Sequence, residues 1–258
     1  MIDGIDSNLT ATDARRGASR REVLLAGGAG ALGFALAAAP AAGAAVRGAT
    51  RGESEEVVNV AATVEVLTTI VTTTALQKLS LPPAAVATVG AAAREELLHY
   101  EVLTERFGGH PATTQIWVPD AVFASPTALF TTLVIGEQIC INLYLVATTV
   151  WASNGLGDLA RAGAELVGNE AVHRALARQA LGLQPNDRAF MKYNQPEEAE
   201  GPGHGMPGFT TARGAIEQFE AAGIGFGTKG ASPGAFYDFG AVRRHTPNPS
   251  FVNTRAPH

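Results

Sequence analysis

The chain has 258 residues, a formal net charge of −5 and 46% hydrophobic residues. This length and apolar fraction allow one or two domains with a sizeable core. The mildly negative charge, without a basic face, argues against nucleic acid as a partner.

Residues 1–44 are predicted to be an export signal and not part of the fold. The segment Ser19 to Leu25, SRREVLL, is similar to the twin-arginine motif, although Val23 and Leu25 replace the usual Phe and Lys. A Gly/Ala-rich apolar run and a candidate cleavage site, Ala42 to Ala44, follow it. This predicts a periplasmic, envelope or extracellular location. A disordered leader or an uncleaved anchor is the alternative, although the run is short and Gly-rich for a membrane span.

Two long helices are predicted before residue 108. The first covers about residues 55–79 and carries Glu65 inside an apolar run. The second is opened by Pro82 and Pro83, because proline fits the first helical position, and ends near Phe107 before two glycines. Glu96 and His99 lie three positions apart in the second helix, so they share one face.

Residues 109–125 form a connection in which hydrophobic residues show no convincing periodicity, and Pro111 and Pro119 interrupt it. About ten to twelve extended residues cross a bundle roughly 35 Å tall, so this stretch is long enough to do so. A simple up-and-down bundle needs only a short connection at this point. The length of this stretch therefore favours a crossover connection, which runs along the full height of the bundle.

Two more helices are predicted over residues 126–153 and 157–181. Ser125 and Pro126 suit the cap and first position of the earlier one, in which Glu137 is the only charge between residues 127 and 152. This run exceeds the roughly twenty residues that a bilayer needs, so a membrane helix is the alternative. A carboxylate near its middle is costly in lipid, which favours a core helix and no stable membrane span.

Residues 185–258 are rich in Gly and Pro, and a short fifth helix is predicted over residues 212–222. Five aromatic residues after residue 222 argue against plain disorder in the last part of the chain. They are Phe226, Phe236, Tyr237, Phe239 and Phe251. We expect an extended tail that packs on the outer apolar faces of the first and third helices.

Acids and histidines recur along the four long helices as Glu, Glu-x-x-His, Glu, Glu-x-x-His. The residues are Glu65, Glu96, His99, Glu137, Glu170 and His173. One such match is weak evidence, whereas two matches, each preceded by an acid in an apolar run, are much harder to obtain by chance. A hairpin that turns at Pro82 and Pro83 brings Glu65 and Glu96 to one height, and the second half repeats this arrangement.

This pattern resembles the ferritin-like superfamily, whose four-helix bundles hold two metal ions in the core. The resemblance covers residues 55–182 and is nearest to exported bacterial proteins related to plant desiccation-related proteins, then to rubrerythrin and bacterioferritin. It implies an all-α fold with a four-helix bundle over residues 45–184 and a long crossover between the second and third helices. Residues 185–258 would form a C-terminal extension with a short helix.

The resemblance also implies a ligand set for two ions. Glu96 and Glu170 would bridge or chelate the ions, the isolated acids would be terminal ligands, and each histidine would cap one ion. Oxygen-rich ligation with one imidazole per ion suits iron or manganese. No rubredoxin-type Cys-x-x-Cys module is present, and Cys140, the only cysteine, excludes an intrachain disulfide.

Two functions remain open from the sequence. The first is a di-metal oxidoreductase, ferroxidase or peroxidase-like, that acts on dioxygen, peroxide or ferrous iron in stress protection. The second is a non-catalytic envelope or desiccation-stress protein with a structural or vestigial metal site. A homodimer is left open as well.

Several other polar residues are given simpler interpretations. Tyr100, Cys140 and Tyr144 lie within two helical turns of the predicted ligands, where hydrogen bonding to a ligand or a redox role is an alternative to the favoured core packing. Arg174 is the cation nearest to Glu170 in the sequence. The loop histidines are expected to be solvated: His110, His204 and His245.

Overall fold

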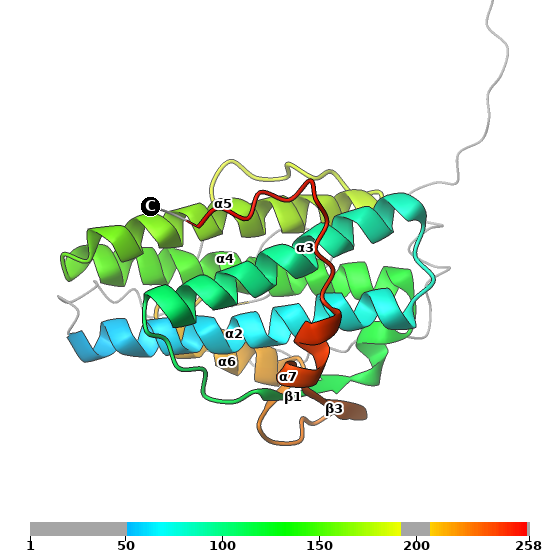
Figure 1. Cartoon of the computed structure of the whole chain (residues 1–258), viewed down its shortest axis with the longest axis horizontal. Helices are drawn as coiled ribbons and strands as arrows, with labels where there is room; N and C mark the ends of the chain where they lie inside the picture. The colour runs from blue at the N-terminus through cyan, green and yellow to red at the C-terminus, as the bar shows by residue number, and fades with distance from the viewer. Residues whose placement is uncertain (1–50, 192–206, 257–258) are drawn as a thin grey trace, which may run out of the picture. The chain divides into compact units, whose positions relative to one another are not determined.

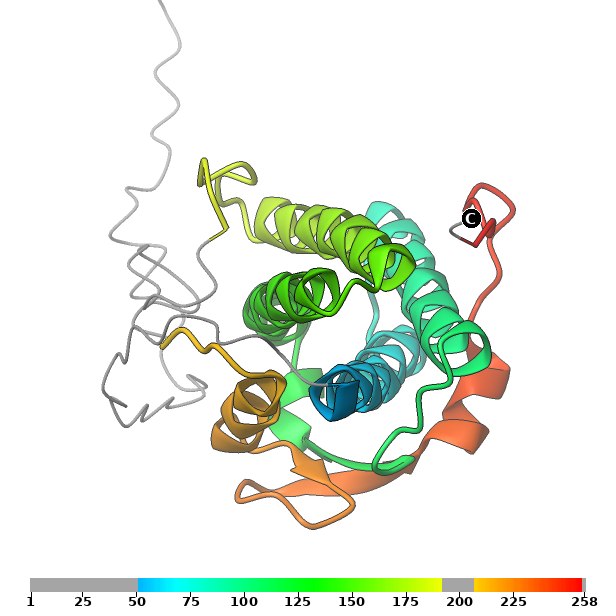
Figure 2. The ribbon, with the colours of Figure 1, turned by 90° about the vertical axis from the view of Figure 1, so that its left-hand side faces the viewer.

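The computed structural model describes residues 51–191 and 207–256, which are mostly helical with one small sheet. Four long helices form two consecutive pairs: α2 (Arg51–Lys78), α3 (Pro83–Glu101), α4 (Pro126–Ser153) and α5 (Gly157–Ala180). They lie side by side (Figure 1), and the view in Figure 2 shows them around a common interior. The prediction of a mostly helical chain is confirmed. The predicted export signal lies outside the described residues.

The helix boundaries follow local sequence signals. Ser125 Oγ accepts a hydrogen bond from the backbone N–H of Ala128, and Pro126 occupies the first position of α4, as predicted. The second helix is shorter than predicted, because α3 gives way to a π-helical turn, η1 (Val102–Arg106). Gly108, with φ of 70°, follows this turn in a left-handed conformation that favours glycine.

The pair α4 and α5 packs closely because of one small residue. Gly163 of α5 faces α4, and a Cβ atom at this position would lie 2.7 Å from Thr148 Oγ1 and 2.9 Å from the Trp151 ring. Any larger residue would therefore push the two helices apart. Trp151 is fully buried, and its indole N–H donates a 3.3 Å hydrogen bond to the Ser54 carbonyl, which joins α4 to the first turn of α2.

Within residues 51–191 and 207–256, two helices are long and apolar enough to cross a membrane, Gly52–Lys78 and Pro126–Ser153. The most apolar 18-residue stretch of Gly52–Lys78 is 89% buried inside the protein, and that of Pro126–Ser153 is 72% buried. Both helices therefore belong to the protein core, and the core-helix interpretation of the α4 sequence is confirmed.

The connection between α3 and α4 runs from one end of the helices to the other (Figure 1), as its length suggests. It contains two elements that the sequence analysis does not predict, β1 (Gln115–Pro119) and a 3-10 turn, η2 (Asp120–Phe123). The residues of β1 after Gln115 are buried. The connection is thus an ordered part of the fold.

A three-stranded antiparallel sheet joins this connection to the C-terminal segment. Its order is β2-β1-β3, with β2 at Gly225–Phe226 and β3 at Gly234–Asp238. Ile116 of β1 is paired with Phe226 on one side and with Tyr237 on the other. This sheet is an addition to the predicted all-helical fold, and its strands are too short and too far apart in the sequence to be recognised from a local pattern.

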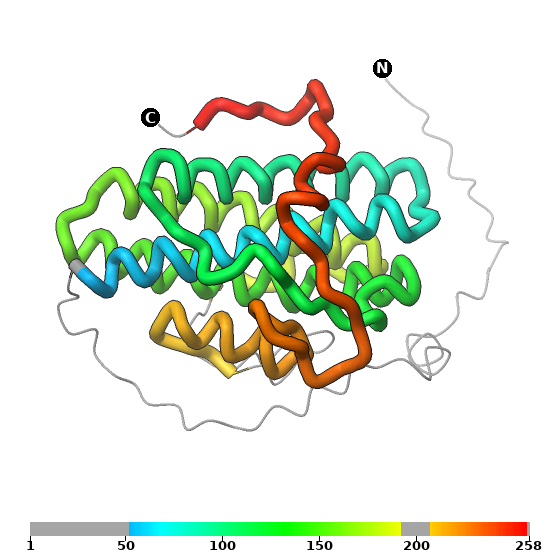
Figure 3. Tube along the Cα trace, turned by 60° about the horizontal axis from the view of Figure 1, so that its bottom comes forward, coloured from blue at the N-terminus to red at the C-terminus, as the bar shows by residue number. Residues whose placement is uncertain are grey.

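The C-terminal segment packs on the long helices, as predicted. Its helix α6 (Ala212–Ala221) lies against α4 and α2 (Figures 2 and 3) and buries Ala215 and Phe219. Further along, α7 (Phe239–Val242) and the turn η3 (Arg243–His245) contact α2. The C-terminal segment therefore covers the side of the interior that α2 and α4 would otherwise expose.

Candidate metal centre

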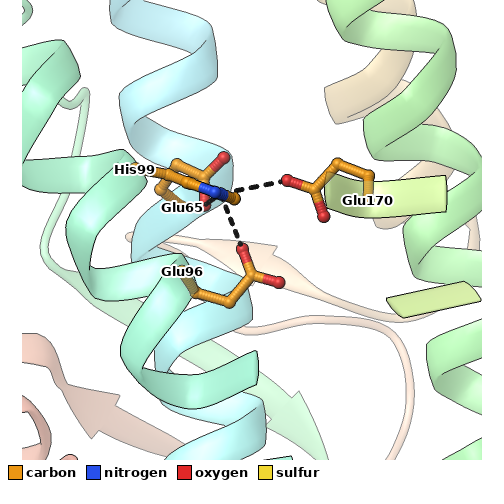
Figure 4. Close-up of side chains that lie close together, drawn as sticks. All are labelled: Glu65, Glu96, His99 and Glu170. Carbon is orange, nitrogen blue, oxygen red and sulfur yellow. Dashed lines mark ion pairs between the residues drawn. The ribbon is translucent and has the colours of Figure 1, made fainter. Parts of the chain in front are cut away.

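All four long helices contribute acidic side chains to the same interior region. The six predicted residues come from α2 (Glu65), α3 (Glu96, His99), α4 (Glu137) and α5 (Glu170, His173). Figure 4 shows four of these side chains pointing toward one another from three helices. The structure thus brings together every residue of the predicted set.

The six residues form two overlapping groups that could each hold a metal ion. Glu65 and His99 belong to the first group and Glu137 and His173 to the second, whereas Glu96 and Glu170 belong to both. Within each group, one ligand atom of every residue lies within 4.8 Å of the others. The residues shared between the groups are those that the resemblance assigns as bridges.

His99 lies at the centre of the first group (Figure 4). Its Nδ1 atom is 3.1 Å from Glu170 Oε1, 3.6 Å from Glu96 Oε2 and 3.7 Å from Glu65 Oε2. One ring nitrogen therefore faces oxygens of three carboxylates from three different helices.

His173 has the corresponding position in the second group. Its Nδ1 atom is 3.0 Å from Glu96 Oε1, 3.2 Å from Glu170 Oε2 and 3.9 Å from Glu137 Oε2. Its other ring nitrogen, Nε2, lies 2.7 Å from Glu95 Oε2. The two imidazole rings are stacked with centroids 6.3 Å apart.

The cluster is almost completely buried. Glu65, Glu96 and Glu170 have no exposed surface, and Glu137 is 2% exposed. Among the described residues, Glu137 Oε2 is buried without a hydrogen-bond partner, and its nearest imidazole nitrogen, His173 Nδ1, is 3.9 Å away. A buried polar atom without a partner is costly, so the arrangement fits a group that would occupy the space beside it.

Two of the carboxyl groups favour their neutral form in the protein alone. Burial, followed by the charge of Glu96, raises the pKa of Glu65 well above its usual range. Burial and the charges of Glu96 and Glu170 do the same to the pKa of Glu137. In the two predicted terminal ligands, burial and neighbouring negative charges therefore favour the neutral carboxyl group when no cation is bound.

The shared carboxylates and the histidines are shifted toward their charged forms. Burial alone would raise the pKa of Glu96, but contacts with His173 and His99 hold it well below the usual range. Burial and the charge of Glu96 would likewise raise the pKa of Glu170, but the same two histidines lower it. Burial would lower the pKa of each histidine, but the facing carboxylates raise it well above normal. The carboxylates that face each imidazole thus favour its protonated form when no cation is bound.

Arg174 does not neutralise Glu170, although it is the nearest cation in the sequence. Its guanidinium forms a bidentate ion pair with Asp187, with N–O distances of 2.8 and 3.0 Å. Arg178 contacts the same carboxylate at 3.2 Å. The guanidinium of Arg174 is therefore directed to Asp187 and not to Glu170.

Three residues around the cluster were not assigned to it from the sequence. The Tyr144 hydroxyl donates a short hydrogen bond to Glu65 Oε1, so the favoured interpretation of Tyr144 as core packing alone is wrong. Thr68 Oγ1 lies 3.2 Å from Glu65 Oε2 and 3.1 Å from Glu96 Oε2. Glu95, which contacts His173, could have been suspected from its place directly before Glu96, but its partner lies on another helix.

The remaining polar residues match the simpler interpretations. Tyr100 packs against Phe239, with ring centroids 4.6 Å apart, and Cys140 is a buried free thiol outside both groups. His110 and His245 are exposed, whereas His204 lies outside the described residues.

None of the family models, curated proteins and solved structures with which the chain was compared matches it.

Proposed function

We propose that this chain is an exported ferritin-like protein whose six-residue cluster binds two iron or manganese ions. One observation carries the proposal: two buried groups of four ligand residues, drawn from four helices, share Glu96 and Glu170. That arrangement matches the ligand scheme of di-metal sites in helical bundles. The crossover between α3 and α4 agrees with the same fold.

The charges of the cluster support two divalent ions. Its four carboxylates carry four negative charges when all are ionised, and two divalent cations balance them without leaving unpaired charge in the core. Glu65 and Glu137 would each serve one ion, Glu96 and Glu170 would lie between the ions, and each histidine would complete one site. Oxygen-rich ligation with one imidazole per ion favours iron or manganese.

The histidines are oriented for this role. Each Nδ1 faces the carboxylates, and the contact of His173 Nε2 with Glu95 would keep the Nε2 proton and leave Nδ1 free to act as a ligand. Tyr144 and Thr68 would hold Glu65 in place from α4 and from its own helix. His173 and Glu65 of the proposed ligand set are thus preorganised by side chains outside it.

The reaction that we propose is oxidoreduction of a small oxidant, dioxygen or peroxide, with ferrous iron as an alternative substrate. Bound iron or manganese would supply the one-electron chemistry, and the chain's residues would hold the ions in a dry interior. The twin-arginine motif supports export through a pathway that carries folded proteins, so the site would be filled before export. A structural metal site without turnover is the competing function.

The test is anaerobic loading with ferrous iron, followed by hydrogen peroxide or air, while the visible absorbance is recorded. An oxidoreductase predicts oxidation of the bound iron much faster than in buffer, repeatable after reduction. Glu137→Gln should slow it, because it alters a terminal ligand, whereas Glu105→Gln on the exposed surface should not. Stoichiometric metal binding without faster oxidation would contradict the oxidoreductase and support a structural role for the metal.

A further inference from the structure

An apolar cavity of about 50 Å³ lies between α2, α4 and α6. Its walls are almost entirely aliphatic and aromatic, with two residues from each helix or its immediate continuation: Leu67, Val71, Ile135, Ile139, Phe219 and Ile224. Figure 2 shows α6 lying beside α2 and α4, and Phe219 of α6 and Ile224 after it line the cavity from this side. The cavity therefore exists only because the C-terminal segment covers the long helices.

The inner end of this cavity reaches the candidate metal centre. Glu137 and Thr68 both line it. Glu137 Oε2 is buried and has no hydrogen-bond partner among the described residues, and the Thr68 hydroxyl contacts carboxylates of Glu65 and Glu96. On the outer side, Leu133 and Gly136 of α4 are partly exposed. The cavity thus extends from partly exposed residues to the second group of ligands.

The lining selects the kind of molecule that can stay there. A water molecule needs two to four polar partners, and apart from Thr68, Thr132 and Glu137 the lining residues offer no polar side chain. Apolar cavities of roughly 150 Å³ hold benzene or xenon, so a volume about one third of that suits a molecule of two heavy atoms or a single xenon atom. An aromatic ring or a longer hydrocarbon would need more space.

We propose that this cavity is a binding site for a small apolar molecule of the size of dioxygen, which it places beside Glu137. The chemical use of the molecule rests on the proposed function, but its binding does not need metal. The cavity also gives α6 a role, since Phe219 and Ile224 complete the wall nearest to the ligand residues. Dioxygen, unlike peroxide, matches such a lining because it has no hydrogen-bond donors to satisfy.

Gly136 offers a way to fill the cavity from α4 without touching a proposed ligand. A Cβ atom at this position would have its nearest contact at 3.7 Å, with Phe219 Cε1, so alanine fits in ordinary van der Waals contact. Leucine would extend into the cavity and occupy most of it. Gly168 is exposed on α5, and a Cβ atom added there would meet no other atom within 4 Å, so it is a matched control for replacing a helical glycine.

The experiment measures xenon and benzene binding to the folded full chain, with metal-free and metal-loaded samples, by ¹²⁹Xe NMR and by crystallography under xenon pressure. We expect one xenon site between α2, α4 and α6 in both samples, and no benzene there. Gly136→Leu should lower xenon affinity at least about tenfold, whereas Gly168→Leu should leave it unchanged. If Gly136→Leu does not fold, Gly136→Ala should still weaken xenon binding measurably.

Absence of xenon from this cavity, or equal binding in the Gly136 and Gly168 variants, would overturn the inference, and benzene binding would overturn the size that we assign. A different result, the absence of metal from the loaded chain, would overturn the proposed function. Xenon binding by a chain that takes up no metal would keep the cavity site and remove the di-metal centre. Metal uptake without xenon binding would keep the di-metal centre and remove the cavity site.

Discussion

Glu95 of α3 and His173 of α5 are joined by a 2.7 Å contact between Oε2 and Nε2. This contact lowers the pKa of Glu95 and directs the opposite ring nitrogen, Nδ1, toward Glu96 and Glu170. A carboxylate behind an imidazole fixes the ring and raises its basicity as a ligand.

Replacing Glu95 by glutamine should therefore weaken metal binding without changing any proposed ligand. We expect a loss of about 10- to 100-fold in affinity, confined mainly to the ion held by His173. Titration with Mn²⁺, followed by electron paramagnetic resonance, measures this loss. Glu105→Gln, an exposed change on the turn after α3, is the control. Equal affinities in the two variants would show that Glu95 does not position His173.

The metal-free protein should lose stability as pH rises. Burial gives Glu65 and Glu137 a folded-state pKa above the unfolded value. The unfolded chain then releases these protons first, so the stability is full below the unfolded pKa and is lost as pH rises through the folded one. His99 and His173, whose pKa values are also raised, add to the loss at higher pH.

Glu96 and Glu170 act in the opposite direction, because their pKa values are lowered and their contribution disappears as pH falls. That contribution is complete above the unfolded pKa of about 4.5, so thermal unfolding from about pH 5 to about pH 9, with and without Mn²⁺, reports the groups whose pKa values are raised. We expect the melting temperature of the metal-free protein to fall over this range, while the metal-loaded protein melts higher because metal binds the folded state. A metal-free melting temperature that rises steadily with pH would be inconsistent with the charges assigned to the cluster.

Asp187 should stabilise the segment after α5 except in strong acid. Burial alone would raise its pKa, but the hydrogen bond and charge of Arg174 lower it to about 2. Its contribution is present above the usual value of 3.8 and is lost as pH falls toward 2. After allowance for solvent screening, Asp187→Asn should cost about 1–2 kcal/mol of unfolding free energy at neutral pH.

Urea unfolding at neutral pH and near pH 2.5, roughly midway through the expected loss, measures this contribution. Asp158→Asn is the control, since that side chain is 81% exposed at the start of α5. The Asp187 variant should differ from wild type at neutral pH and approach it in acid. An equal difference at both pH values would mean that the ion pair is not the cause.

The ligand positions could be predicted because helical periodicity decides them locally. Glu96 and His99, three residues apart, must share a face, and the turn at Pro82 and Pro83 sets the height of Glu65. Tyr144 could not be assigned in this way, because its partner depends on how α4 is rotated against α2. The same holds for the pairing of Glu95 with His173 across α3 and α5.

The small sheet was missed for a related reason. The segment of β1 contains a proline and is only five residues long, and its hydrogen-bonding partners lie in the C-terminal segment. Strand pairing between distant segments depends on the tertiary structure, which local patterns do not encode. The aromatic residues of the tail did indicate that it packs, and Tyr237 contacts Lys78 of α2 through a 2.6 Å hydrogen bond.

The most direct test of the di-metal centre is the metal content of the purified chain after loading with ferrous or manganous ions, measured by inductively coupled plasma mass spectrometry. We expect about two ions per chain in the wild type and in the Glu105→Gln control. Glu96→Gln or Glu170→Gln should lose most of both ions, because each belongs to both groups, whereas His99→Ala should lose mainly one. A wild-type chain that retains fewer than about one ion, or variants that bind as the wild type does, would contradict the account.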